Sequence, residues 1–234
     1  MYFLEEVLKK FGEEIKGKTF ALSGYGNVTW GACLKLNELG AKVVSISGSH
    51  GYVYDPDGVS GEKIDYLLKM RQSTTGTIKD YAEKYNLPFH AGEKPWGNVK
   101  ADIYMPCATQ NEITLEDAKK TVAMGVKIVN EASNMSTTLD AMDYLKEHGV
   151  IVCPSKAVNA GGVATSGLEM TQNSERLSWT KDEVDGKLRI IMKNIYNQMT
   201  DTLEEYGLGY DLVAGANLSG FRKVADAMLA EGIY

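Results

Sequence analysis

The sequence has few of the residues that build metal sites or disulfide frameworks. Its 234 residues include only three cysteines, Cys33, Cys107 and Cys153, and three histidines. The cysteines are widely spaced and form no CxxC pair, so neither a zinc cluster nor a disulfide framework is indicated. We therefore expect no metal site, and free, buried or half-buried thiols of the kind found in a reducing compartment.

The sequence also lacks a long apolar run and an excess of basic charge. No apolar run approaches the roughly 18 residues of a membrane span. The first residues include Glu5 and Glu6, where a secretory signal needs basic residues. The formal net charge of −6 argues against a nucleic-acid-binding protein, which usually carries a basic patch. We expect a soluble, cytoplasmic protein that binds neither membranes nor nucleic acid.

The spacing of apolar residues predicts an alternation of strands and helices. Strands are expected at 19–23, 42–47, 52–58, 101–105, 126–129 and 150–153, the third running into a Pro-Asp-Gly turn. Helices are expected at 2–16, 28–39, 60–72, 77–85, 114–123, 137–147 and 217–231. A further apolar stripe from Val184 to Leu203 predicts a long helix.

This alternation is typical of an α/β fold of the Rossmann type. Such a fold has a doubly wound, mostly parallel sheet with helices on both faces, here followed by extra C-terminal helices. The sequence shows no repeat and no Gly/Ser-rich linker. We therefore expect residues 1–234 to form one domain.

A glycine turn follows the first predicted strand and opens the next helix. It reads Gly24-Tyr25-Gly26-Asn27-Val28-Thr29. In a dinucleotide-binding fold the first glycine permits the tight turn, the second lets the backbone approach the pyrophosphate, and the helix N-terminus faces the phosphates. The third position is usually Gly or Ala, and Thr29 departs from that pattern. A turn that merely needs two glycines is the alternative, but the surrounding βαβ unit favours dinucleotide binding.

The end of the second predicted strand bears on the choice of dinucleotide. It reads Ser47-Gly48-Ser49-His50-Gly51 and contains no carboxylate to hold the ribose 2′-hydroxyl of NAD. Hydroxyl groups of Ser47 and Ser49 with the His50 imidazole suit a 2′-phosphate, so we expect NADP in preference to NAD. A solvated loop without a role in selectivity is the alternative. If His50 holds the phosphate when protonated, NADP affinity should fall as the pH rises.

Four further segments resemble the C-terminal half of hexameric bacterial glutamate dehydrogenases, within the Glu/Leu/Phe/Val dehydrogenase family. They are Pro106–Asn111 (PCATQN), Asn130–Met135 (NEASNM), Pro154–Val163 (PSKAVNAGGV) and Gln172–Trp179 (QNSERLSW). The resemblance extends over essentially the whole chain. It implies a cofactor-binding domain of an enzyme that interconverts L-glutamate with 2-oxoglutarate and ammonia.

The resemblance also implies roles for individual residues. Ala108, Thr109 and Asn134 correspond to positions beside the nicotinamide ribose, and Asn159 to a position beside the nicotinamide. Val163 and Ser166 correspond to positions that touch the substrate's side chain. Two alternatives from the residues themselves remain open. Asn134 could cap a helix that begins near Ser136, and the Ser166 hydroxyl could bond to its own helix.

The catalytic lysine and aspartate of the family lie in an N-terminal substrate domain whose motifs are not present here. Lys156 is accordingly expected to be structural. The chain starts, in the resemblance, inside the helix that links the two domains, so we expect it to bind NAD(P) without catalysis. Full-length members are homohexamers, and a monomer or weak dimer is expected here.

Three rival functions are weighed against this one. A leucine-, valine- or phenylalanine-type dehydrogenase shares the architecture, although an apolar substrate pocket would have no use for the Ser166 hydroxyl. A non-catalytic nucleotide-binding module could reuse the domain. A methyltransferase-like domain would need an acid after the second strand, and the sequence has none there.

Overall fold

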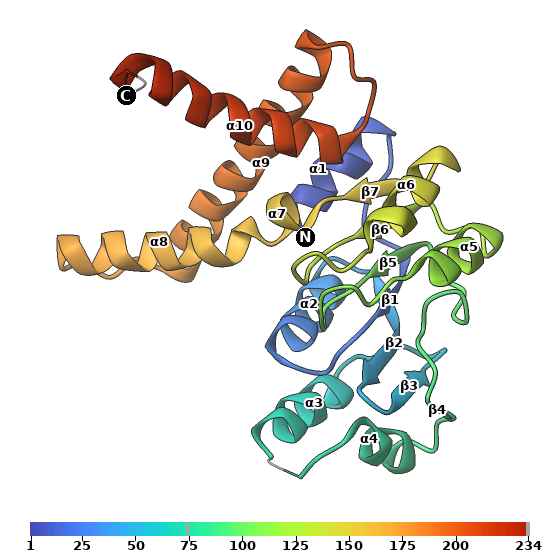
Figure 1. The fold of residues 1–234 in the computed structure, drawn as a ribbon. Coiled ribbons are helices and arrows are strands. Elements are labelled where there is room, and N and C mark those ends of the chain that lie inside the picture. The colour runs from blue at the N-terminus through green and yellow to red at the C-terminus, as the bar shows by residue number, and fades with distance from the viewer. Residues whose placement is uncertain (74, 233–234) are drawn as a thin grey trace.

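A seven-stranded sheet lies at the centre of the molecule (Figure 1). The structure is a computed structural model that describes residues 1–73 and 75–232. The strand order is β4-β3-β2-β1-β5-β6-β7, and the β2–β3 and β3–β4 pairs are antiparallel whereas the other pairs are parallel. The strands are β1 (Thr19–Leu22), β2 (Lys42–Gly48), β3 (Gly51–Tyr54), β4 (Phe89–Ala91), β5 (Ile103–Met105), β6 (Ile128–Asn130) and β7 (Ile151–Cys153). The expected α/β fold with a mostly parallel sheet is confirmed.

Helices cover both faces of this sheet. Phe20 and Leu22 of β1 pack into one apolar cluster with α1, α2 and α9, while Ala21 faces a second cluster with α5 and α6. The side chains of a strand alternate between the two faces, so both faces of β1 are buried. The helices are α1 (Tyr2–Lys10), α2 (Asn27–Glu38), α3 (Glu62–Gln72), α4 (Ile78–Lys84), α5 (Leu115–Ala123), α6 (Leu139–Glu147), α7 (Ser155–Val158), α8 (Ala160–Glu175), α9 (Lys181–Glu205) and α10 (Leu212–Glu231).

The helices α8, α9 and α10 extend away from the sheet (Figure 1). Helix α8 has no buried residue, whereas α9 buries Met192, Tyr196, Met199 and Leu203 against the rest of the protein. The apolar stripe predicted for this region is therefore buried mainly in its second half. Within residues 1–73 and 75–232, no helix combines the length and the apolar character that a membrane span requires.

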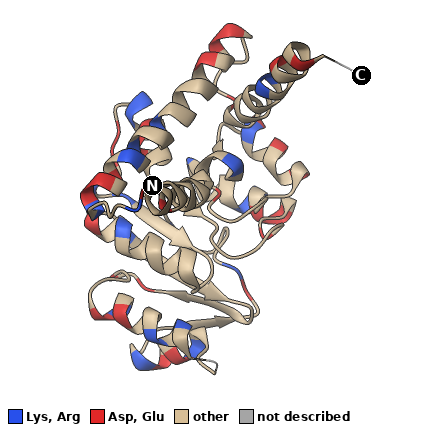
Figure 2. Ribbon diagram, turned by 90° about the vertical axis from the view of Figure 1, so that its left-hand side faces the viewer, with Lys and Arg blue, Asp and Glu red and all other residues tan. Residues whose placement is uncertain are grey.

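Charged residues lie on the helices and loops, and the strands contain almost none (Figure 2). Along the helices, Lys and Arg are interspersed with Asp and Glu (Figure 2). This distribution is the one expected for a sheet enclosed between two layers of helices.

Two helix boundaries and one strand show how the structure differs from the expected elements. The helix expected over 2–16 ends at Lys10, because the backbone turns at Gly12 with φ of +69°, and Phe11 is 49% exposed. Strand β4 was not predicted. Helix α10 begins at Leu212 rather than at 217, because the Asp211 side chain caps it by accepting from two backbone amides.

The three cysteines are free and buried. Burial raises the pKa of the Cys33 thiol to about 12, and it raises the pKa of Cys107 and Cys153 as well. Thiols of this kind stay protonated at neutral pH and are poor nucleophiles. The expectation of buried free thiols is confirmed.

Candidate functional site

The sheet reverses its winding direction beside β1. The chain passes from β1 to β2 on one side and later returns to β5 on the other side of β1. In open α/β sheets the crevice at such a switch point, beyond the carboxyl ends of the strands, is where ligands bind. The segments that follow β1, β5, β6 and β7 therefore compose the candidate site.

Gly24 shapes the turn that follows β1. Its φ of +78° lies in the left-handed region that favours glycine. A Cβ added at Gly24 would lie 2.8 Å from Thr29 Oγ1 and 3.3 Å from the Ala108 Cβ. Any larger residue would thus push the turn away from α2 and from the segment after β5. Gly26 is different, since a Cβ there would meet no heavy atom within 4 Å.

The structure explains why Thr29 can stand where the usual pattern has Gly or Ala. Its side chain is fully buried, and its hydroxyl donates to the Ser23 carbonyl oxygen at 2.8 Å. The hydroxyl therefore ties the first turn of α2 to the end of β1. Gly or Ala in this position allows the helix to pack closely against the strand. Thr29 achieves the same close packing of α2 against the end of β1 through its hydrogen bond to the Ser23 carbonyl.

The N-terminus of α2 opens onto the same space. Gly26 is the N-cap residue, no side chain caps this end, and the first turn carries no acidic residue. The first N–H groups of a helix have no partner within the helix, and its dipole places partial positive charge there. This end of α2 is therefore suited to bind an anionic group that approaches across Gly26.

A cleft of about 680 Å³ lies beside this turn, and we call it the glycine-turn cleft. It is bordered by the glycine turn, the β2–β3 connection, the end of α3, the segment after β4 and the segment after β5. The residues that line it are Gly24, Tyr25, Gly26, Ser47, Gly48, Ser49, Gly51, Met70, Arg71, Ser73, Gly92, Glu93, Lys94, Pro95, Cys107, Ala108, Thr109 and Glu112. Five of the residues proposed from the glycine pattern and the second strand are in this set, and Ala108 and Thr109 join them.

The β2–β3 connection lies at one side of the cleft. The Ser47 hydroxyl accepts the Gly24 N–H at 3.0 Å, so it helps to hold the glycine turn. Ser49 is exposed and lines the cleft. His50 is exposed in the same turn but does not line the cleft, and its carbonyl accepts the Gly92 N–H at 2.9 Å.

Sequence reasoning missed the charged residues that line the cleft. Arg71 comes from the last turn of α3, with its guanidinium carbon 5.3 Å from the centre of the Trp30 ring. Glu93 and Lys94 come from the segment after β4 and are exposed. No local pattern marks these residues, because only the packing of α3 and of β4 brings them to the turn.

Glu112 is the buried carboxylate of the cleft. Its Oε1 accepts the backbone N–H of Ala108 at 3.3 Å, that of Thr109 at 3.2 Å and the Ser133 hydroxyl at 3.3 Å. Burial raises the pKa of the Glu112 carboxyl above its ordinary value, and hydrogen bonds from Ser23 and from the groups just named oppose that rise. This side chain therefore connects the segments that follow β1, β5 and β6.

The two asparagines implied by the resemblance lie together. The Asn159 side-chain amide donates to Asn134 Oδ1 at 2.5 Å, which joins the segment after β6 to the start of α8. Asn134 does not cap α6, which begins at Leu139 with Thr138 as its N-cap residue. The pairing of Asn134 with Asn159 orients both side chains at the carboxyl edge of the sheet.

Helix α8 carries the two positions assigned to substrate contact. Val163 is 73% exposed, and the exposed Ser166 hydroxyl donates to the Gly162 carbonyl at 3.3 Å. The back-bonding alternative for Ser166 is thus what the structure shows in this state. Lys156 donates to the Asn217 side chain and so joins α7 to α10.

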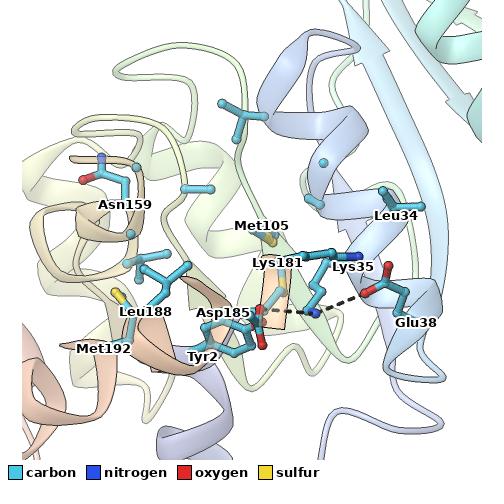
Figure 3. A pocket seen from close by; sticks show the side chains of 18 residues that line it. Tyr2, Leu34, Lys35, Glu38, Met105, Asn159, Lys181, Asp185, Leu188 and Met192 are labelled. Atoms are coloured by element: carbon cyan, nitrogen blue, oxygen red, sulfur yellow. Dashed lines mark hydrogen bonds and ion pairs between the residues drawn. The ribbon is translucent and has the colours of Figure 1, made fainter. Parts of the chain in front are cut away.

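A second cavity, of about 510 Å³, lies between α1, α2, α8 and α9, and we call it the helix cavity (Figure 3). Val28 and Asn159 line it, so it adjoins the glycine-turn cleft at the start of α2. The Lys35 ammonium in this cavity lies 3.1 Å from the Glu38 carboxylate and 3.9 Å from that of Asp185, and Lys181 also lines the cavity. The glycine-turn cleft is the better candidate for an anionic ligand, because the glycine turn and Gly26, the N-cap residue of the uncapped helix α2, border it.

Comparison with known sequences identifies the family. The profile of the Glutamate/Leucine/Phenylalanine/Valine dehydrogenase family matches residues 1–232. This chain belongs to that family. The resemblance found in the sequence is confirmed at this level.

The relatives are glutamate dehydrogenases of about twice this length. The NAD-specific glutamate dehydrogenase of Clostridium symbiosum is 55% identical over 235 residues, which cover 100% of this chain and 52% of that protein. The NADP-specific glutamate dehydrogenase of Haemophilus influenzae is 47% identical over 239 residues, with 100% and 52% covered. The chain thus spans about half the length of the curated relatives it matches.

Solved structures agree with this relationship. A glutamate dehydrogenase structure superposes with a TM-score of 0.95 at 56% identity, over 99% of this chain and 52% of that one. The glutamate dehydrogenase of Plasmodium falciparum superposes with a TM-score of 0.94 at 42% identity, over 100% and 50%. The fold of this chain therefore matches that of about half of each of these chains.

Proposed function

We propose that this chain is the dinucleotide-binding half of a glutamate dehydrogenase and that it holds NADP in the glycine-turn cleft. The observation that carries the proposal is the geometry of Gly24 to Thr29. Gly24 has a left-handed backbone conformation, Gly26 has open space beside it, and the N-terminus of α2 has no side-chain cap. These features fit a pyrophosphate, because its oxygens need close backbone approach and N–H donors. The relatives are named NAD-specific and NADP-specific glutamate dehydrogenases, which supports a nicotinamide dinucleotide as the ligand and leaves the preference for NADP to the charges of the cleft.

The residues of the cleft and the Asn134–Asn159 pair beside the adjoining helix cavity then contact different parts of the cofactor. The turn and the start of α2 bind the pyrophosphate, and the β2–β3 connection borders the adenosine end. Ala108, Thr109 and the Asn134–Asn159 pair border the nicotinamide end, where the paired amides orient the carboxamide and so fix the ring face presented to substrate. When bound, the cofactor supplies the acceptor or donor of the hydride.

The preference for NADP rests on the charges at the adenosine end. The β2–β3 connection has no carboxylate, and Arg71 brings a guanidinium to the same cleft as Ser49. A guanidinium pairs well with a phosphate, and its stacking over Trp30 holds it in place. Glu93 is the opposing charge in the cleft, but it is exposed and therefore well screened.

Titration calorimetry with NADPH and NADH tests this preference. We expect tighter binding of NADPH in the wild type. Arg71→Ala should weaken NADPH binding about tenfold, or about 1.4 kcal/mol, because a charge-assisted contact to the 2′-phosphate is lost. NADH binding should change little. Lys79→Ala is the matched control, since Lys79 is an exposed cation paired with Glu83 outside the cleft.

Two outcomes would count against the preference. If Arg71→Ala lowers the affinities for NADPH and NADH equally, Arg71 contacts a group that both cofactors share. Tighter binding of NADH than of NADPH by the wild type would reverse the preference. The His50→Ala variant adds a separate check, because loss of the pH dependence of NADPH binding would assign the phosphate to His50 as well.

The reaction proposed for the complete enzyme is the reversible oxidative deamination of L-glutamate to 2-oxoglutarate and ammonia. Val163 and Ser166 lie on the exposed face of α8, where a substrate held by a second domain can reach them. The Ser166 hydroxyl favours a substrate with a distal carboxylate over leucine, valine or phenylalanine. This chain alone should bind the cofactor without catalysis, because a two-domain cleft is needed to place substrate against the nicotinamide.

Turnover and sedimentation measurements address the isolated chain. We expect no 2-oxoglutarate-dependent oxidation of NADPH, in the presence of ammonium, above that of a mock preparation. Turnover above that background would overturn the assignment of catalysis to the other domain. Analytical ultracentrifugation should show a monomer or weak dimer, and a stable hexamer would contradict that expectation.

A further inference from the structure

Glu112 is mostly buried, 9% exposed, at the floor of the glycine-turn cleft. The hydrogen-bond donors to its carboxylate are neutral groups: two backbone amides and the Ser133 hydroxyl reach Oε1, and the Ser23 hydroxyl is a further donor. These bonds fix the carboxylate against the segment that carries Ala108 and Thr109. They do not neutralise its charge.

Within the described part of the chain, the carboxylate of Glu112 has no ion-pair partner. Among residues 1–73 and 75–232, no Lys, Arg or His nitrogen lies within the ion-pair distance of 4.0 Å from its oxygens. The ammonium of Lys94 is directed elsewhere, to the Glu112 carbonyl at 2.7 Å and to the Asp117 carboxylate at 3.5 Å. A buried carboxylate without a cation costs free energy, and it is an acceptor for any cation that enters the cleft.

We propose that Glu112 makes this site favour the oxidised dinucleotide over the reduced one, by supplying an uncompensated negative charge at the nicotinamide end of the cleft. The inference rests on the proposed function, because it takes the nicotinamide to lie beside Ala108 and Thr109. The nicotinamide ring of the oxidised dinucleotide carries a positive charge that the reduced ring lacks. The adenosine, ribose and phosphate groups are the same in both forms, so their interactions cancel in the ratio of the two dissociation constants.

The burial of Glu112 makes its charge effective. Interactions between charges are stronger in a partly desolvated cleft than in water, and they are screened less by salt. The raised pKa of the Glu112 carboxyl shows the same desolvation. The charged side chains that line the same cleft are Arg71, Glu93 and Lys94, of which Lys94 pairs with Asp117. The Cys107 thiol, which also lines the cleft, stays neutral because burial raises its pKa.

The sign of the pH dependence follows from these groups. Above the raised pKa of Glu112 the carboxylate is ionised, and the preference for the oxidised form is present. As the pH falls through that pKa, the carboxyl gains a proton and the preference is lost. The pH dependence of the 2′-phosphate affects both redox forms alike.

The experiment compares the wild type with Glu112→Gln by calorimetric titration with NADP and with NADPH. Glutamine keeps an oxygen in the place of Oε1 that can accept the two backbone amides and the Ser133 hydroxyl, and it removes the charge. We expect the affinity for NADP to fall about tenfold and the affinity for NADPH to change less than about twofold. Asp55→Asn is the matched control, because Asp55 is a buried carboxylate paired with Lys63 outside the cleft. The ratio of its NADP affinity to its NADPH affinity should equal that of the wild type.

Several outcomes would overturn the inference. An unchanged NADP/NADPH ratio in Glu112→Gln, or equal losses for both forms, would reduce Glu112 to a structural support of the loop. If the variant fails to fold, the wild type is titrated with both dinucleotides at neutral pH and at decreasing pH. A ratio of NADP affinity to NADPH affinity that does not fall as the Glu112 carboxyl gains its proton overturns the inference. Wild-type protein that binds neither dinucleotide would overturn the proposed function itself, which is a different result from a failure confined to the ratio.

Discussion

Two buried carboxylates occupy opposite ends of the same sheet. Asp55 is fully buried beyond the end of β3, and it accepts from the Lys63 ammonium at 2.7 Å and the Tyr81 hydroxyl at 3.1 Å. Burial and the charge of Asp55 raise the pKa of Tyr81, so the phenol remains a donor. Glu112, at the carboxyl end of the sheet, is held by neutral donors alone.

This difference separates residues that hold the fold from residues prepared for a ligand. The charge of Asp55 is compensated within the chain, so its interactions are complete without a partner. Among the residues that the structure describes, none pairs with the charge of Glu112, caps the N-terminus of α2 with a side chain or fills the space beside Gly26. Incomplete interactions gathered in one cleft are what a binding site requires.

The largest expected effect is a loss of stability when the paired carboxylate of Asp55 is changed. Asp55→Asn should lower the free energy of unfolding by about 3 kcal/mol, because it leaves the partly buried ammonium of Lys63 without its carboxylate. Urea unfolding followed by circular dichroism measures this change. Dinucleotide affinity should stay as in the wild type. A loss below about 1 kcal/mol would place Asp55 among ordinary surface ion pairs and would weaken the comparison.

An intermediate effect is expected from a substitution that changes only the cleft. Gly26→Ala should lower NADPH affinity at least about tenfold, since the methyl group stands where the pyrophosphate approaches. Stability should change by less than about 0.5 kcal/mol, because a Cβ at Gly26 meets no heavy atom within 4 Å. Fluorescence titration and thermal unfolding of the same sample give both quantities. Gly24→Ala is the contrasting variant, and it should lose stability as well as affinity.

The smallest expected effect is a gain in stability when Glu112 is replaced by glutamine. Burial raises the pKa of Glu112, so the folded protein binds this proton more tightly than the unfolded chain does. The cost of the buried charge is present above that pKa and disappears as the pH falls through it. Glu112→Gln should therefore be as stable as the wild type at acid pH and more stable by up to about 1 kcal/mol near neutrality. Lower stability of the variant at neutral pH would show that the carboxylate supports the fold as Asp55 does.

The sequence predicts the βαβ unit and the strand ends because these depend on local patterns. Glycines after an apolar strand, and polar residues after the later strands, mark the turn and the edge of the sheet without reference to the rest of the chain. The choice of Asn134 and Asn159 came from the family resemblance, and their hydrogen bond shows how two distant segments meet.

Other features depend on tertiary contacts and could not be predicted in this way. Phe11 continues the apolar spacing of α1, yet the left-handed turn at Gly12 ends the helix and leaves Phe11 exposed. Strand β4 is three residues long and exists because it pairs with β3. Arg71 and Glu112 have no motif, and their importance follows from which segments pack around the glycine turn.

The location of the bound dinucleotide is the most direct test of the central claim. Amide chemical shifts of the isotope-labelled protein would be followed by NMR as NADPH is added. The account predicts that the largest shifts fall on Gly24 to Thr29 and on Ala108 and Thr109, with saturation at one site. Shifts confined to the helix cavity around Lys35 and Glu38, or no saturable shifts, would contradict it.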